Sequence, residues 1–262
     1  MRAVPIRIND AKAGIDYFKA SFQKNWKHYL QEAFGLAIFM ISACLFTTLF
    51  ESKGAYFHKL ITTGVFRNII IGLLMGGTAL LIFYSPLTAP SGAHINPAVT
   101  ISFWRLGKIG TADAIFYCIF QVMGGTLAVY LMQWIIGKPL TEMPVNSCAT
   151  IPLGGITAAA VTEFLIAFAT MSMVLFTSHH AKLRKYTRVF AGCLVCLWVI
   201  TAGPVSGFGM NPARSFASAL PSNTWTGFWI YLLVPFAGML LATVFFKIKT
   251  SSEFINSKNE LQ

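Results

Sequence analysis

One eight-residue pattern occurs twice in the chain, and it constrains the fold more than any other feature. Residues 91–98 read SGAHINPA and residues 206–213 read SGFGMNPA, so that five positions match. Each copy follows two long apolar runs, and Glu32 in the first run of one half has a counterpart in Glu163 in the first run of the other. The chain is therefore a duplicated unit with three apolar runs in each half.

The apolar runs are long enough to cross a lipid bilayer. The chain is 55% hydrophobic and 11% charged, whereas ordinary soluble domains are about 25% charged. A spanning helix needs about 20 apolar residues. We therefore predict an all-α integral membrane protein with six transmembrane helices, at roughly 29–50, 65–84, 112–136, 156–178, 187–203 and 225–247.

The positive charge follows a membrane topology. A net charge of +11 could suggest nucleic-acid binding, but with six spans most of the 20 Lys and Arg residues fall in loops on the side of the termini. Such an excess marks the cytoplasmic side. We expect cytoplasmic N and C termini in a plasma or inner cell membrane, and no nucleic-acid partner. The polar start up to Lys27 predicts no removable signal peptide.

An odd number of spans in each half inverts the second half, so the two patterned segments approach each other at the middle of the membrane. Asn is a strong helix cap and Pro suits the first helical position, so Asn96-Pro97 and Asn211-Pro212 predict helix starts there. Irregular Gly-rich backbone at this depth indicates a water-lined cavity. Each helix start carries about half a positive charge, and two such ends repel cations while neutral molecules pass.

The two motifs, the second of which continues into Arg214, resemble those of the aquaporin or major intrinsic protein family over residues 28–248. The resemblance implies an aquaporin fold, with two re-entrant half-helices in inverted repeats at about 28–138 and 156–248. Segments 1–27 and 249–262 would be a cytoplasmic N-terminal segment and tail. It also implies a passive channel in the lipid bilayer that passes water and small uncharged solutes, without enzymatic activity, cofactor or metal, and a homotetramer.

The resemblance further implies roles for single residues. The motifs are Asn96, Pro97, Ala98 and Asn211, Pro212, Ala213, whose two Asn amides would donate hydrogen bonds to the permeant. The accepting backbone carbonyls would belong to Gly92, Ala93, His94, Gly207, Gly209 and Met210. A four-residue selectivity filter would consist of Gly76, Val199, Phe208 and Arg214.

Three charged residues are expected inside the membrane. An unsupported Arg there costs at least ~2.5–3.5 kcal/mol on insertion scales, so we expect polar groups beside Arg214, which would form the cationic corner of the filter. We expect Glu32 and Glu163 to be buried acceptors for backbone donors of the re-entrant loops. The alternative, proton carriers of an ion-coupled secondary transporter, is less favoured because the groups expected at the midplane are neutral amides.

The expected filter predicts the range of solutes. Gly76 contributes no side chain and Val199 a small one, where strict water channels of the family have an aromatic residue and His. Phe208 is shared with glycerol-conducting relatives, whereas Ser215 and Ala219 follow the water-channel pattern. We expect water plus small uncharged solutes such as glycerol, with a strict water channel as the alternative.

Three weaker patterns have less favoured functional interpretations. Ser91 and His94 near Ser206 would suit an intramembrane hydrolase only with an orienting acid, which the sequence does not supply. The basic loop around His179 and His180 fits topology and attraction to lipid headgroups, with a pH or gating switch as the alternative. An interfacial aromatic belt is expected from Trp104, Trp134, Trp225, Trp229 and Tyr231.

Overall fold

The computed structural model describes residues 11–259, with side chains placed over 13–247, and this part of the chain contains helices and no strand. The outermost parts of the predicted terminal segments, 1–10 and 260–262, lie outside the described residues. Six helices are long and apolar enough to span a membrane. They are α1 (Ala11–Glu51), α3 (Gly64–Tyr84), α5 (Thr111–Ile136), α7 (Ile156–His179), α8 (Thr187–Ser206) and α10 (Phe228–Asn259). The predicted fold class is confirmed.

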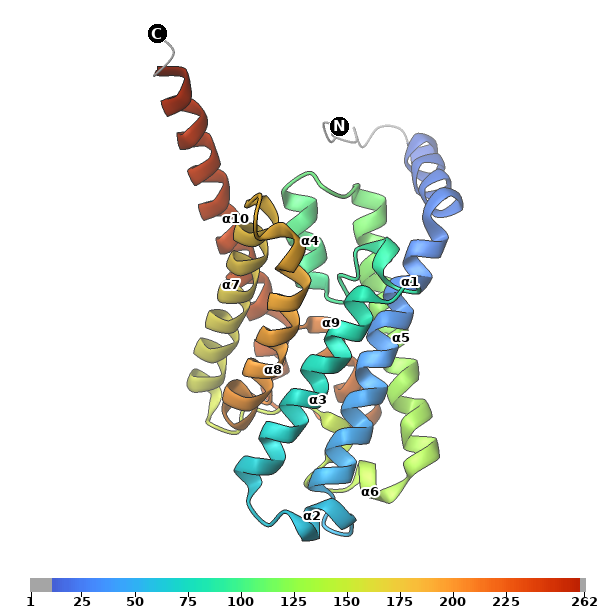
Figure 1. Ribbon diagram of the computed structural model, residues 1–262. Coiled ribbons are helices and arrows are strands. Elements are labelled where there is room, and N and C mark those ends of the chain that lie inside the picture. Colours follow the sequence, from blue (N-terminus) through green and yellow to red (C-terminus); the bar gives the residue numbers. More distant parts are fainter. Residues whose placement is uncertain (1–10, 260–262) are drawn as a thin grey trace.

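Two shorter helices begin at the repeated motifs, as predicted. They are α4 (Pro97–Arg105) and α9 (Pro212–Ser222), and they lie among the long helices in Figure 1. The remaining elements are the short helices α2 (Tyr56–Leu60) and α6 (Lys138–Thr141) and the 3-10 turns η1 (Ala89–Ser91), η2 (Asn146–Cys148) and η3 (Arg184–Tyr186).

The bundle has two distinct ends (Figure 1). The start of α1, the end of α10 and the loop 180–186 lie at one end, which we call the terminal face. Helices α2 and α6 lie at the other end, which we call the opposite face. Because α4 and α9 both run from the interior outward but belong to inverted halves, their starts meet inside the bundle.

Glycines let the long helices of each half pack closely. Helix α1 packs on α5, and its counterpart α7 packs on α10. A Cβ on Gly238 of α10 would lie 2.6 Å from the carbonyl oxygen of Phe164 in α7, and a Cβ on Gly124 of α5 would likewise overlap the backbone of Ala33 in α1. Only glycine fits these two contacts, which are equivalent in the two halves.

Helix α1 begins 18 residues before the predicted span at 29–50. A carboxylate on α5 holds this extension, because Asp113 Oδ1 accepts hydrogen bonds from Ser21 Oγ (2.6 Å), Asn25 Nδ2 (2.9 Å) and Tyr29 Oη (2.6 Å). The sequence showed the polarity of this segment. It did not show the distant acceptor on α5 that stabilises it as a helix.

Candidate functional site

The two motif asparagines cap the two short helices. Asn96 Oδ1 accepts a hydrogen bond from the backbone N–H of Ala98 at 2.8 Å, and Asn211 Oδ1 accepts from that of Ala213 at 3.1 Å. Each is followed by a proline at the first helical position. Both asparagines have extended backbone, as a cap residue requires. The local chemistry of Asn-Pro therefore fixes where both helices start.

The same asparagines also bind across the repeat boundary. Asn96 Nδ2 donates to the carbonyl of Met210 at 2.9 Å, and Asn211 Nδ2 donates to the carbonyl of Ile95 at 2.6 Å. Each amide nitrogen carries two hydrogens, so this exchange leaves one N–H on each side chain. Both side chains line an internal cavity, and the remaining donors are available to a molecule inside it.

Glu32 holds the first re-entrant loop. Its Oε1 accepts from Ser91 Oγ at 2.7 Å and from the backbone N–H of His94 at 2.9 Å. Its Oε2 accepts from the backbone N–H of Ile95 at 2.6 Å and from Gln121 Nε2 at 2.8 Å. The carboxylate is fully buried, and these four donors explain how a buried acid is tolerated there.

Glu163 holds the second re-entrant loop in the same way. Its Oε1 accepts from Ser206 Oγ at 2.6 Å and from the backbone N–H of Gly209 at 2.8 Å, and its Oε2 accepts from the backbone N–H of Met210. The two acids thus occupy equivalent positions and anchor equivalent backbone donors. In this geometry both carboxylates accept hydrogen bonds from the re-entrant loops.

The anchored N–H groups orient the backbone carbonyls of the loops. In a planar trans peptide the C=O points opposite to the N–H. Because the N–H groups of His94 and Ile95 point at Glu32, the carbonyls of Ala93 and His94 point away from it. The second loop has the same arrangement, which turns the carbonyls of Phe208 and Gly209 away from Glu163. Four non-glycine residues of the two loops have positive φ, at equivalent positions: Ala93, Ile95, Phe208 and Met210.

Part of the expected carbonyl set is already bonded or lies outside the cavity. The carbonyl of Met210 accepts from Asn96, and Gly207 does not line the cavity, whereas Gly92, Ala93, His94 and Gly209 do. The carbonyl of Phe208, which lies in the same stretch from Gly207 to Met210, also points away from Glu163 and can accept. The acids that bind the loop N–H groups decide which carbonyls face the cavity, and residue positions in the sequence alone do not show this.

Two tyrosines complete the anchoring, and the sequence interpretation missed this role. Tyr117 Oη on α5 donates to the carbonyl of Ser91 at 2.8 Å, and Tyr231 Oη on α10 donates to the carbonyl of Ser206 at 2.7 Å. Tyr231 is fully buried, so its assignment to the interfacial belt is wrong. The signal that could have found the pair is their equivalent place in the third long helix of each half.

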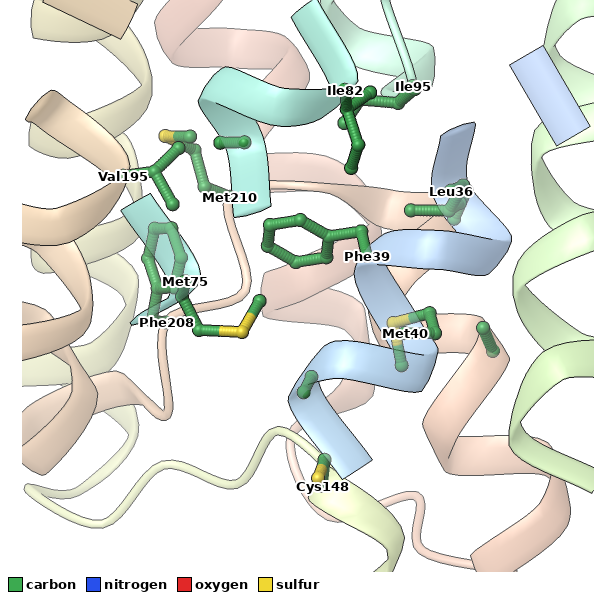
Figure 2. Close-up of a cluster of buried hydrophobic side chains, with 14 of the residues drawn as sticks. Leu36, Phe39, Met40, Met75, Ile82, Ile95, Cys148, Val195, Phe208 and Met210 are labelled. Atoms are coloured by element: carbon green, nitrogen blue, oxygen red, sulfur yellow. The ribbon is translucent and has the colours of Figure 1, made fainter. Parts of the chain in front are cut away.

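The cavity has a volume of about 620 Å³, and both motif asparagines line it. It extends from Arg184, Lys185 and Arg188 near the terminal face to Phe208 and Arg214. Figure 2 shows the apolar side of its inner part, where Phe39, Phe208 and Met210 lie near one another. No Asp or Glu of the described residues lines the cavity, and its charged groups are basic.

Arg214 lies in the first turn of α9 and is 9% exposed. We expected polar groups to bind it, but among the described residues its Nε and Nη1 have no hydrogen-bond partner. Two buried donors without an acceptor are costly. Arg214 also lines the cavity, so its positive charge acts on a molecule inside it.

The expected filter is only partly assembled around the cavity. Phe208 and Arg214 line it, and Gly76 and Val199 do not. A Cβ on Gly76 would lie 2.7 Å from Cys196 Cβ and 3.0 Å from the carbonyl oxygen of Gly192. Gly76 therefore serves the packing of α3 on α8, and it leaves no gap in the cavity wall. The α3 side chain beside Phe208 in Figure 2 is Met75, which is buried in the same apolar cluster.

Replacing Gly76 by Ala is expected to lower stability by about 1–3 kcal/mol, as overpacking does, without changing solute selectivity. Gly77→Ala is the matched control, because a Cβ there would meet nothing within 4 Å. Thermal unfolding in detergent compares the two variants. Equal unfolding midpoints of the two variants, together with an altered ratio of glycerol to water flux in Gly76→Ala, would show that Gly76 belongs to the selectivity filter.

The serine and histidine side chains do not form a hydrolase site. Ser91 and Ser206 donate their hydroxyl hydrogens to Glu32 and Glu163. The Nδ1 of His94 lies 3.2 Å from Thr100 Oγ1 instead of a serine. The polar groups considered for catalysis are thus used to hold the loops.

Alanine at Asn96 or Asn211 is expected to lower both stability and water flux. Each variant loses a helix cap worth about 1 kcal/mol and leaves a carbonyl of the other repeat without its donor. Asn96→Asp and Asn211→Asp keep the capping oxygen but replace the amide donor by a charged carboxylate oxygen, so their flux is also expected to fall although the cap remains. Full water flux with normal expression in both alanine variants would contradict the midplane site.

Comparisons with known proteins find a family model and several relatives that match most of the chain. The model of the major intrinsic protein family matches residues 19–246. Aquaporin NIP1-4 of Oryza sativa subsp. japonica is 34% identical over 163 residues, which is 62% of this chain and 58% of that protein. Aquaporin NIP1-1 of Zea mays is 30% identical over 210 residues, 80% of this chain and 70% of that protein.

One solved structure has the same fold. The X-ray structure of the aquaglyceroporin from Plasmodium falciparum superposes with a TM-score of 0.69 at 19% identity, and covers 84% of this chain and 94% of that chain. The chain spans little more than half the length of the rice protein and, at 58%, of aquaporin NIP1-2 of Arabidopsis thaliana.

Proposed function

The chain belongs to the major intrinsic protein family, and from this premise we propose that it is a passive transmembrane channel for water and small uncharged solutes such as glycerol. The observation that carries the proposal is the pair of asparagines at the helix starts. They line one cavity, bind each other's loop and keep one free amide N–H each. A neutral molecule with an oxygen acceptor fits these donors.

Ion exclusion follows from the charges around the same point. The starts of α4 and α9 each present the positive end of a helix dipole to the cavity. Arg214 adds a formal positive charge beside them. A cation or hydronium ion that enters would meet three positive centres, and water can donate and accept hydrogen bonds along the wall without a net charge.

The wall supports uncharged solutes as well as water. The carbonyls of Ala93, His94, Phe208 and Gly209 turn away from the anchoring acids and can accept from hydroxyl groups. Phe39 and Phe208 give the same wall an apolar side. A small polyol presents hydroxyl groups on one side and C–H groups on the other, so it matches such a wall. A strict water channel is the alternative, if the apolar side chains close the passage to anything larger.

An ion-coupled transporter is disfavoured because both membrane acids are bound by the re-entrant loops. Glu32 accepts four hydrogen bonds and Glu163 accepts three, and neither lines the cavity. A proton carrier must exchange protons with the transport path. The homotetramer and the cytoplasmic position of both termini in a plasma or inner membrane belong to the same proposal, on the resemblance and the charge distribution.

Stopped-flow light scattering on proteoliposomes tests the proposal. We expect fast water-driven shrinkage with a low activation energy in the absence of any ion gradient, and glycerol-driven reswelling faster than in empty vesicles. Asn96→Asp is the comparison variant, because it keeps the cap. Water flux without glycerol flux would favour the strict water channel, and flux that requires an ion gradient would contradict a channel.

A further inference from the structure

Three basic side chains line the mouth of the cavity near the terminal face. Arg184 and Lys185 come from η3, and Arg188 comes from the first turn of α8. All three are exposed, and no Asp or Glu of the described residues shares the cavity wall with them. A channel for neutral molecules does not require cations at its mouth. These charges therefore point to a further ligand.

Topology explains why the loop is basic, but it does not explain where its charges lie. Lys182 belongs to the same loop and would serve the positive-inside bias equally well. It does not line the cavity, whereas Arg184, Lys185 and Arg188 do. The three cations are thus gathered on one wall, beyond what the topology of the chain demands.

The start of α8 adds the positive end of a helix dipole to the same wall. Tyr186 occupies the cap position and gives no side-chain cap, and the backbone N–H of Thr187 already donates to the carbonyl of Arg184. Thr187 also lines the cavity, but its Oγ1 is buried and offers no accessible donor to a ligand there. The positive end of this 20-residue helix favours an anion at this place.

Arg188 is also held in position by an aromatic ring. Its guanidinium lies 5.5 Å from the ring centre of Tyr84, the last residue of α3, and Tyr84 lines the same cavity. The contact brings the guanidinium of α8 toward α3. Arginine binds phosphate through paired N–H groups, and the contact with the ring leaves these edge donors free.

We propose that this mouth binds a phosphate group, from either a lipid headgroup or a free phosphate ion or ester, and that the bound phosphate obstructs the cavity. The two guanidinium groups and the ammonium group supply donors from several directions, as a tetrahedral group with several acceptor oxygens requires, and the positive end of α8 adds to the attraction. Because the site lies on the wall of the proposed pathway, its occupant competes with permeants for space. The expected effect of phosphate on water flux rests on the proposed channel function, whereas the phosphate binding itself does not.

Equilibrium dialysis tests the binding with radiolabelled inorganic phosphate and the full-length protein in neutral detergent, with the ionic strength held constant by sodium chloride. The triple variant Arg184→Gln/Lys185→Gln/Arg188→Gln is expected to bind at least about tenfold more weakly. Lys182→Gln, which removes one charge from the same loop, is expected to bind as the wild type does. Equal binding by the triple variant and the wild type would overturn the site, as would an equal loss in Lys182→Gln.

Water flux in proteoliposomes identifies the source of the phosphate. Inorganic phosphate in vesicles of phosphatidylcholine tests the free ion, and vesicles containing phosphatidic acid without free phosphate test the headgroup. When half of the sites are occupied, wild-type water flux should fall about twofold in the condition that contains the phosphate source that the protein binds. The flux of the triple variant should be the same with and without that source. No slowing in either arm would overturn the obstruction.

The two proposals can fail separately. A protein that conducts water but binds no phosphate remains a channel without this site. A protein that binds phosphate through the three basic residues but conducts nothing keeps the site, and the proposed function is then wrong.

Discussion

The Glu163→Gln variant is expected to lose nearly all water permeability, although glutamine has almost the same volume as glutamate. Three donors converge on the carboxylate, from Ser206 Oγ and the backbone N–H groups of Gly209 and Met210. Glutamine replaces one oxygen by an NH₂ group that faces at least one of these donors. Each buried donor left unpaired costs about 1–3 kcal/mol, and the loop that carries Asn211 loses its anchor.

Thermal unfolding in detergent and water flux at matched protein content measure this effect. Glu142→Gln is the control, because Glu142 is an exposed acid near the opposite face. We expect Glu32→Gln to behave like Glu163→Gln, since Glu32 anchors the first loop through the same kinds of donor. A Glu163→Gln variant with wild-type melting and flux would show that the carboxylate does not hold the loop.

The Arg214→Val variant is expected to conduct water but to leak protons at least about tenfold faster than the wild type. Two unit charges 4 Å apart interact by about 4 kcal/mol at an effective dielectric constant of about 20, and about 1.4 kcal/mol corresponds to a factor of ten. Valine removes this repulsion and leaves the two helix dipoles. It also removes two buried donors that have no partner among the described residues, so the fold should tolerate the change.

A pH-sensitive dye inside proteoliposomes reports the leak under an imposed proton gradient. Lys138→Val is the control, because it removes an exposed cation outside the cavity. If Arg214→Val retained both the proton barrier and the solute selectivity of the wild type, Arg214 would have no part in the filter.

The features that the sequence predicted depend on local chemistry or on length. Long apolar runs predicted six spans, and the structure places the helices from α3 to α8 close to the predicted bounds, whereas α10 continues to Asn259, beyond the predicted end at 247. The Asn-Pro pairs gave the starts of α4 and α9, because capping is decided within three residues. The repeat itself predicted that Glu32 and Glu163 would have equivalent surroundings.

The features that it did not predict depend on how helices rotate and meet. Counting back from Asn96 reached Gly76, but that residue lies on the side of α3 that packs against Cys196. The buried partner of Tyr231 is a backbone carbonyl on another segment. Likewise, loop composition did not separate Arg188, which lines the cavity, from Lys182, which does not. Each of these outcomes is set by contacts between segments distant in the sequence.

The most direct test of the account is water flux and proton flux measured in the same preparation of wild-type proteoliposomes. The paired asparagines and the two helix starts predict fast water movement with a low activation energy, together with a proton permeability no higher than that of empty vesicles. Proton flux that rises in parallel with water flux, or water flux no faster than through lipid alone, would contradict the account.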